Sequence, residues 1–157
     1  MKIPYDPAIH GPLGIPAPKI PYDQWPADDL RSALVQAADG EETWSHELLA
    51  AGANPTGMPL IMAIQYGELE IVRLFIAAGT DVDRDWARTT PLIRAVTAGY
   101  PVIVQALIDA GADVNKPDEK GLPLAHVGHG SRRATDEDWA AIRRMLLAGG
   151  AIDPEDV

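Results

Sequence analysis

The fold is decided by two stretches: residues 59–83 read PLIMAIQYGELEIVRLFIAAGTDVD, and residues 91–115 read PLIRAVTAGYPVIVQALIDAGADVN. The second stretch follows the first at a step of thirty-two residues, and Pro-Leu, the next Ala and two glycines recur at that step. A third Pro-Leu begins at Pro123, thirty-two residues further on. Self-similarity with a period of roughly 20–50 residues is typical of proteins built from stacked units. The sequence therefore predicts a repeat architecture.

Each unit is predicted to contain two helices. Pro59 and Pro91 suit the first turn of a helix, because a proline there loses no intrahelical hydrogen bond. Gly67 and Gly99 are placed to end these helices about two turns later. A second helix with an apolar stripe follows at once, and another glycine ends it. The expected fold class is all-α.

Residues 90–95 (TPLIRA), with the closing segment 110–115 (AGADVN), resemble an ankyrin repeat. Residues 58–83 are similar to a second copy, and the segments around 34–54 and 121–151 to degenerate first and fourth copies. The resemblance implies an all-α ankyrin-repeat solenoid of about four helix-turn-helix units with short finger loops. Its repeats would span about 28–55, 56–87, 88–119 and 120–153, within a domain of residues 28–157.

The sequence departs from the family pattern at two kinds of position. The histidine that usually follows Pro-Leu is replaced by Ile61, Ile93 and Ala125, so the inter-repeat hydrogen bonds of that histidine are not expected. The two later finger loops are one residue shorter than usual, and the first connection, residues 54–57, is shorter still. We expect no finger hairpin at this first connection.

The fourth repeat contains an insertion. Pro123 and Gly150 are 27 residues apart, against 20 for the matching residues of the two middle repeats. The seven extra residues fall around 128–133, and we expect them to form a loop between the two helices of this repeat. Thr135 is the predicted N-cap of the second helix, because acidic residues follow it in the first turn.

Residues 1–27 are predicted to form an extended, Pro-rich N-terminal arm. They contain seven of the fourteen prolines, which remove backbone donors and disfavour helix at the preceding residue. The pentamer KIPYD occurs twice in this arm, at residues 2–6 and 19–23. The duplicated pentamer could be a docking motif or could clamp along the repeats, and the alternative is an arm that only packs on the first repeat or stays mobile.

Composition and charge narrow the function classes. The formal net charge of -10 argues against a nucleic-acid ligand, since phosphates are held mainly by Lys and Arg. It suits a basic protein partner, or it serves solubility alone. The absence of Cys excludes disulfides and fits a reducing compartment, and the first residues contain no apolar run for a signal peptide or membrane span. We expect a soluble, cytoplasmic protein that is a monomer on its own and does not contact a membrane.

No catalytic centre, metal site or cofactor is expected. His126 and His129 have a spacing that could bind a metal on a helix, but Gly128 and Gly130 argue against a helix and no third ligand is evident. The sequence contains no phosphate-binding loop, zinc motif or nucleophile elbow. The chain is therefore predicted not to be an enzyme.

The resemblance implies a binding face made of the first helices and the finger loops. Trp86 is the strongest single candidate, because tryptophan is costly to expose and is enriched among binding hot spots, although it could instead fold onto a neighbouring finger. Trp44 and Trp139 are assigned to packing. Arg132 and Arg133 could meet a partner's carboxylate or phosphate, but pairing with Asp136 and Glu137 is favoured. The predicted partner-binding residues are Gln65, Tyr66, Asp85, Trp86, Arg88, Thr89, Thr97, Asp118, Glu119, Lys120, His129, Arg132 and Arg133.

The predicted function is non-catalytic binding of another protein. Small size, acidity and the resemblance together favour a stoichiometric inhibitor or an immunity protein of the antitoxin kind, bound to a basic toxin or effector enzyme. The alternative is a scaffold or adaptor that joins two protein partners, with the duplicated pentamer as its second docking site.

Overall fold

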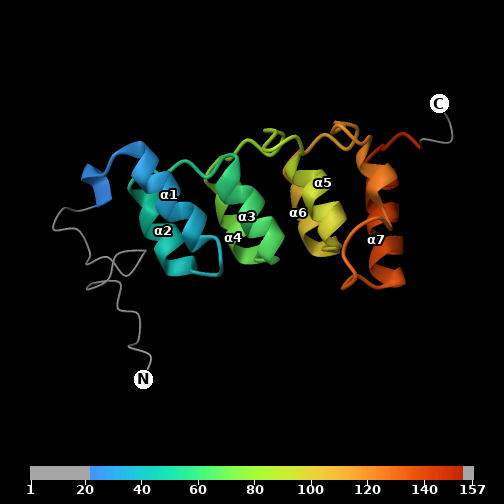
Figure 1. Ribbon diagram of the computed structural model, residues 1–157, viewed down its shortest axis with the longest axis horizontal. Coiled ribbons are helices and arrows are strands. Elements are labelled where there is room, and N and C mark those ends of the chain that lie inside the picture. The colour runs from blue at the N-terminus through green and yellow to red at the C-terminus, as the bar shows by residue number, and fades with distance from the viewer. Residues whose placement is uncertain (1–21, 154–157) are drawn as a thin grey trace, which may run out of the picture.

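The computed structural model describes residues 22–153, which form four units stacked side by side (Figure 1). The described part of the chain contains helices and no strands, as predicted. Its elements are η1 (Tyr22–Gln24), α1 (Ala27–Ala37), α2 (Glu42–Ala50), α3 (Met58–Tyr66), α4 (Leu69–Ala77), α5 (Pro91–Ala98), α6 (Pro101–Asp109), η2 (Pro123–His126) and α7 (Asp136–Ala148), where η marks a 3-10 helix.

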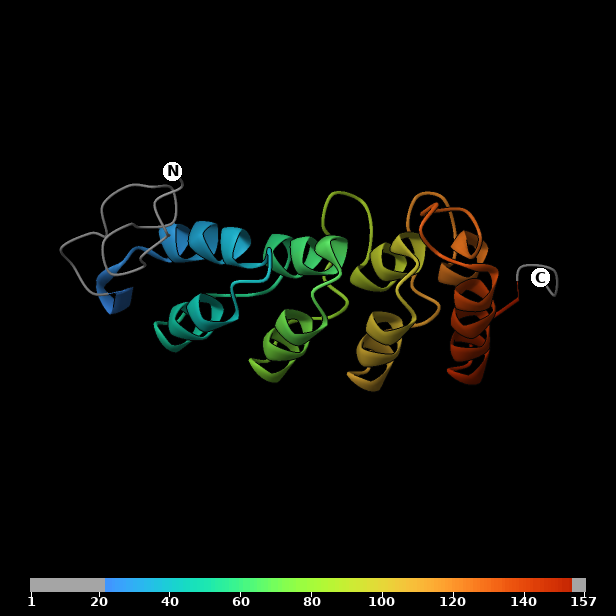
Figure 2. The same ribbon diagram turned by 90° about the horizontal axis from the view of Figure 1, so that it is seen from below.

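The helices lie in two layers (Figure 2). In one layer α1 contacts α3 and α3 contacts α5, whereas in the other α2 contacts α4 and α4 contacts α6. The finger loops before α5 and before η2 project on the side of the first layer (Figure 2). We call the surface formed by α1, α3, α5, η2 and these two finger loops the inner face, and that of α2, α4, α6 and α7 the outer face.

The helix boundaries follow from the residues that the repeat places at each end. The side chain of Thr90 caps α5, because its Oγ1 accepts a hydrogen bond from the Ile93 N–H at 3.1 Å, and Pro91 occupies the first turn. At the other end, Gly99 takes a left-handed conformation with φ of 74° and accepts no side chain without strain. The predicted start and end of this helix are confirmed.

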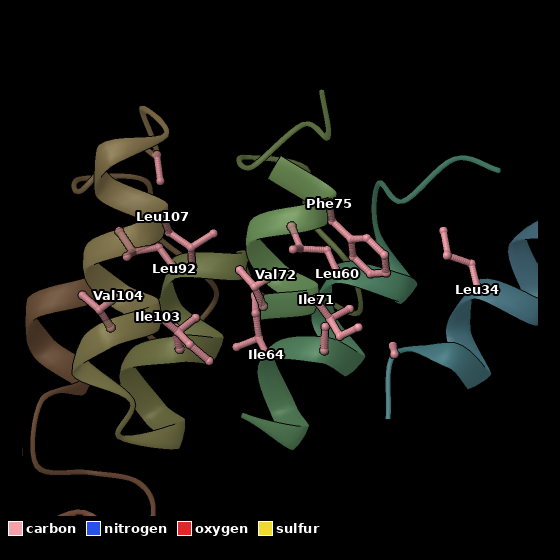
Figure 3. Close-up of a cluster of buried hydrophobic side chains, with 14 of the residues drawn as sticks. Leu34, Leu60, Ile64, Ile71, Val72, Phe75, Leu92, Ile103, Val104 and Leu107 are labelled. Carbon is pink, nitrogen blue, oxygen red and sulfur yellow. The ribbon is translucent and has the colours of Figure 1, made fainter. Parts of the chain in front are cut away.

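The core is built from the same positions in successive repeats. Leu60, Leu92 and Leu124 are each separated by thirty-two residues, and all three are buried. Phe75 lies beside Leu60, and its counterpart Leu107 lies beside Leu92 (Figure 3). Since each unit buries its apolar side chains against its neighbours, the stability of the stack depends on these inter-repeat contacts.

Trp44 and Trp139, which are predicted to be packing residues, lie in or against the hydrophobic core. Trp44 on α2 is only 6% exposed, and Trp139 on α7 packs against the hydrophobic cluster. The ring of Trp139 lies near Gly99 at the end of α5, so this tryptophan joins the third unit to the fourth.

Most of the predicted arm, residues 1–27, and the whole first copy of the pentamer lie in residues 1–21, outside the described residues. The last two residues of the second copy, Tyr22 and Asp23, are described, and they begin the 3-10 turn η1. The prediction of extended chain is therefore wrong for residues 22–24. The ring of Tyr22 meets Trp25 edge-on, with 5.0 Å between ring centroids, and both pack against the core. This aromatic contact fixes the turn at the start of the first repeat.

The fourth repeat departs from the predicted helix pair. In place of a first α-helix it has only η2, a four-residue 3-10 helix that begins at Pro123 as expected. The helix stops because Val127 takes an extended conformation, and Gly128 follows with a φ of 84°. The remaining residues up to Thr135 form the predicted inserted loop.

The inserted loop is anchored to the end of α5. The Ser131 N–H donates to the Thr97 carbonyl at 2.9 Å. A Cβ on Gly130 would lie 2.0 Å from the same carbonyl oxygen, so only glycine fits there. We call residues 127–135 the anchored loop.

Replacing Gly130 with alanine is expected to displace the anchored loop and to lower the free energy of unfolding by about 1–3 kcal/mol, the usual cost of overpacking. Chemical denaturation would measure the effect. Gly128→Ala is a useful comparison, because nothing lies within 4 Å of a Cβ at Gly128, although its left-handed φ adds some strain. An unfolding curve for Gly130→Ala identical to that of the unchanged protein would contradict the close approach to Thr97.

Thr135 begins α7 with a reciprocal pair of hydrogen bonds, as predicted. Its Oγ1 accepts from the Asp138 N–H at 3.1 Å, and the Asp138 carboxylate accepts from the Thr135 N–H at 2.8 Å. The backbone N–H of Thr135 and then its hydroxyl hold the pKa of the Asp138 carboxyl below its usual value. A carboxyl with a lowered pKa stabilises the fold above its ordinary pKa of about 3.9, and the contribution is lost as the pH falls below that value.

Thr135→Ala is therefore expected to destabilise α7 by about 1 kcal/mol at neutral pH. The difference from the unchanged protein should shrink in acid, since protonation of Asp138 weakens the hydrogen bond that its carboxylate accepts from the Thr135 hydroxyl. Melting temperatures measured at neutral and acidic pH would test this, and a difference that grew on acidification would contradict it.

Candidate functional site

A groove opens on the inner face between the two finger loops, above α5 and η2. Its volume is about 680 Å³, and we call it the finger groove. Seven of the predicted partner-binding residues line it: Arg88, Thr89, Thr97, Asp118, Glu119, Lys120 and His129. Five residues that were not predicted also line it: Ala87, Ile93, Arg94, Ala125 and His126.

The finger of the third repeat is a tight hairpin. Trp86 and Thr89 exchange two backbone hydrogen bonds, of 3.0 and 3.2 Å, around a two-residue turn. Both turn residues, Ala87 and Arg88, have positive φ, of 50° and 68°. This is the conformation of a turn that usually contains Asn and Gly, so the side chain of Arg88 is placed at some backbone cost. It lies at the rim of the groove.

Ion pairs join the two fingers. Arg88 pairs with Glu119 of the next finger, and Asp85 pairs with Lys116 at 3.1 Å. Both pairs are largely exposed, so each adds little to stability. They do hold the fingers side by side, and they engage three of the predicted contact residues: Arg88 and Glu119 with each other, and Asp85 with Lys116.

The finger of the fourth repeat is stiffened by a nearly buried carboxylate. Asp118 Oδ1 accepts from the backbone N–H groups of Lys120 at 2.7 Å and Gly121 at 3.1 Å. It also lies 3.1 Å from His126 Nε2, which must donate because an ionised carboxylate only accepts. The Asp118 side chain is only 8% exposed, so this predicted contact residue has little surface left for a partner.

His126 therefore restores an inter-element hydrogen bond from a position one residue later than the family histidine. The structure buries His126 on the short 3-10 helix η2. Within residues 22–153 no group of three or more side chains could hold a metal ion.

Trp86 lies between the two orientations that the sequence left open. A Cβ on Gly57, in the connection before α3, would lie 3.2 Å from the Trp86 ring, so the indole does pack back onto the preceding repeat. The side chain nevertheless remains 39% exposed.

The connection at residues 54–57 forms no bridge pair, as predicted. Its turn is closed by Asn54, whose side chain accepts from the Thr56 N–H.

A second, smaller groove lies in the first two repeats, between the ends of α1 and α3 on the inner face and the start of α2. We call it the N-terminal groove, with a volume of about 430 Å³. Tyr66 is the predicted contact residue that lines it, whereas Gln65 is exposed beside it. The other lining residues are Val35, Gln36, Asp39, Glu41, Trp44 and Met62.

Arg132 and Arg133 lie exposed on the anchored loop, outside both grooves. The favoured prediction, that they pair with Asp136 and Glu137, is wrong: among residues 22–153 neither arginine forms an ion pair. The third carboxylate of the first turn of α7, Asp138, accepts hydrogen bonds from Thr135 instead.

Arg94 is the charged residue among the five groove residues that sequence reasoning missed. It lies on α5, and its Nε is buried without a hydrogen-bond partner among the described residues. The repeat period was the available signal. Arg94 is thirty-two residues after Met62 and thirty-two before His126, and both of these line a groove. The same register thus faces the grooves in three successive repeats.

Charge divides the chain into two halves. Residues 28–87 contain eleven Asp and Glu against three Arg, whereas residues 88–153 contain eight acidic and eight basic side chains. The acidic excess of the described repeats therefore belongs to the first two, and the finger groove lies in the balanced half.

Stacked helix pairs with projecting fingers and one grooved inner face define a helical-repeat protein. A family model of ankyrin repeats, in three copies, matches residues 28–118, and the chain belongs to this family. Ankyrin repeats are protein-protein interaction modules, so the grooved face belongs to a module that binds other proteins. No curated protein sequence matches the chain. Among the described residues, no helix has the length and apolar character needed to cross a membrane.

Proposed function

We propose that the chain is a stoichiometric inhibitor of the immunity-protein kind, which acts in the cytoplasm by covering a basic surface of a toxin or effector enzyme. The observation that carries the proposal is the concentration of acidic side chains in the first two repeats. Complementary charge speeds association and disfavours wrong partners, and its effect weakens with salt.

The N-terminal groove is suited to such a surface. Asp39 and Glu41 lie exposed at its edge, and Tyr66 beside them is 44% exposed. Carboxylates next to an exposed aromatic ring can receive a Lys or Arg side chain both as an ion pair and over the ring face. In this proposal the inner face binds its protein partner without catalysing a reaction, so the chain is not an enzyme.

The proposal is tested by capturing a partner from the native host with the full tagged chain and measuring the partner's activity. We expect one tight partner whose activity is lost at one equivalent of the chain, with an affinity that falls as salt is raised. A partner that stays fully active in a saturated complex would contradict the inhibitor. Turnover of a substrate by the pure chain would contradict the non-catalytic proposal.

The second candidate function is an adaptor that joins two proteins, and the duplicated KIPYD pentamer favours it. Two proteins captured at once, one of which is lost when residues 1–18 are removed, would support the adaptor. The deletion leaves the second pentamer and every described residue in place, so folding of the repeats can be checked by circular dichroism.

A further inference from the structure

Arg94 is an arginine in the finger groove whose side chain has no hydrogen-bond or ion-pair partner among the described residues. Its Nε is buried and makes no hydrogen bond, and none of the ion pairs of residues 22–153 includes it. A buried donor without an acceptor destabilises the fold, and more so when the group is charged. The repeat does not require an arginine at this position of the helix, because the corresponding residue of the preceding repeat is Met62.

The two carboxylates of the groove are already engaged. Asp118 accepts three hydrogen bonds, from His126 and two backbone N–H groups, and Glu119 pairs with Arg88. Arg94 and Lys120 have no such partner within the described chain. The finger groove therefore has an excess of positive charge, although the protein as a whole is acidic.

We propose that Arg94 binds the carboxylate of an Asp or Glu side chain that a partner protein inserts between the two fingers, with Lys120 assisting at the rim. A planar guanidinium matches a carboxylate in charge and geometry, and Arg94 lines the groove without an ion-pair partner among the described residues. The proposal rests on the proposed function, since it names what the partner presents to one end of the inner face.

The groove favours a carboxylate over a phosphate. Its lining contains three basic side chains, Arg88, Arg94 and Lys120, against two carboxylates, so one positive charge is in excess. A carboxylate brings one negative charge, whereas a phosphate group brings nearly two and would meet the repulsion of Asp118 and Glu119.

The two halves of the inner face would then orient the partner. A partner that presents basic side chains to the first two repeats and a carboxylate to Arg94 is complementary in one direction only. The reversed orientation would place the carboxylate against the acidic half, and juxtaposed like charges are costly at an interface.

The first test uses the NMR signal of the Arg94 Nε–H group in the full chain. The probes are a capped Gly-Gly-Glu-Gly-Gly peptide, its Gln counterpart, inorganic phosphate and a short single-stranded oligonucleotide, each up to tens of millimolar. We expect the Glu peptide alone to shift the signal. An equal shift with the Gln peptide, a larger shift with phosphate or the oligonucleotide, or no shift with any probe would overturn the proposal.

The second test uses the captured partner. Arg94→Met reproduces the side chain of the preceding repeat, so the fold should be retained, and we expect affinity for the partner to fall about tenfold or more. Arg73→Met on the outer face is the matched control and should change affinity little. Unchanged affinity of Arg94→Met would overturn the role of Arg94 while leaving the proposed function intact. Failure of the unchanged chain to capture any protein would instead overturn the proposed function.

Discussion

Replacing Phe75 with alanine is expected to lower the free energy of unfolding by about 3–5 kcal/mol. Phe75 is fully buried on α4, and it packs beside Leu60 in the cluster that joins the second repeat to its neighbours (Figure 3). Truncation removes apolar burial and leaves a cavity that rigid helix pairs cannot close. The second repeat is a middle unit of the linear stack, so the substitution weakens its interfaces with both the first and the third repeat.

Denaturation by urea, followed by circular dichroism, would measure the loss. Val102→Ala is the control, because Val102 is an aliphatic residue on α6 that is 59% exposed, and exposed substitutions usually change stability by within about 0.5 kcal/mol. Equal stability losses for the two variants would contradict the assignment of Phe75 to the core.

Trp86→Ala is expected to weaken binding of the partner by about 2 kcal/mol or more, which makes it the largest expected effect on binding. The indole is 39% exposed on the third-repeat finger, beside the groove and supported from beneath by Gly57. An aromatic ring that is held rigid but left partly exposed loses little conformational freedom when a partner covers it.

The substitution should leave helical content unchanged and lower the melting temperature only slightly, because the hairpin hydrogen bonds of Trp86 are made by its backbone. Leu147→Ala, at an exposed apolar residue on the outer face, should change neither stability nor affinity appreciably. If Trp86→Ala unfolded the chain while the folded fraction still bound with full affinity, the ring would be a packing residue and the hot-spot assignment would fail.

The fold could be predicted from the sequence because its signals are local and repeated. Proline at a first helical turn and glycine in a left-handed C-cap act through the backbone alone, and their recurrence fixed both the helix pairs and the unit length. The same local reasoning placed the Thr135 cap correctly. Repeat 4 was harder, since Pro123 signals the start of a helix but not its length, and the close approach of Gly130 to Thr97 that shapes the loop is a tertiary contact.

The sequence predicted which residues lie at the candidate site better than it predicted which of their side chains pair with one another. Seven of the predicted residues meet in the finger groove, because the repeat register already placed them on one face. Which side chains pair was not readable. Arg132 and Arg133 were assigned to nearby acids on sequence distance, whereas Asp118 and His126 pair across eight residues through the fold. Arg94 was overlooked because its lack of a partner is itself a tertiary property.

The central claim is that the inner face, from the first two repeats to the finger groove, binds a protein partner. Amide hydrogen exchange of the chain, with and without the captured partner, tests it most directly. We predict slower exchange in the two finger loops and in the inner helices α3 and α5, with little change in α4 and α6 of the outer face. Protection confined to the outer helices, or absent from both fingers in a saturated complex, would contradict the account.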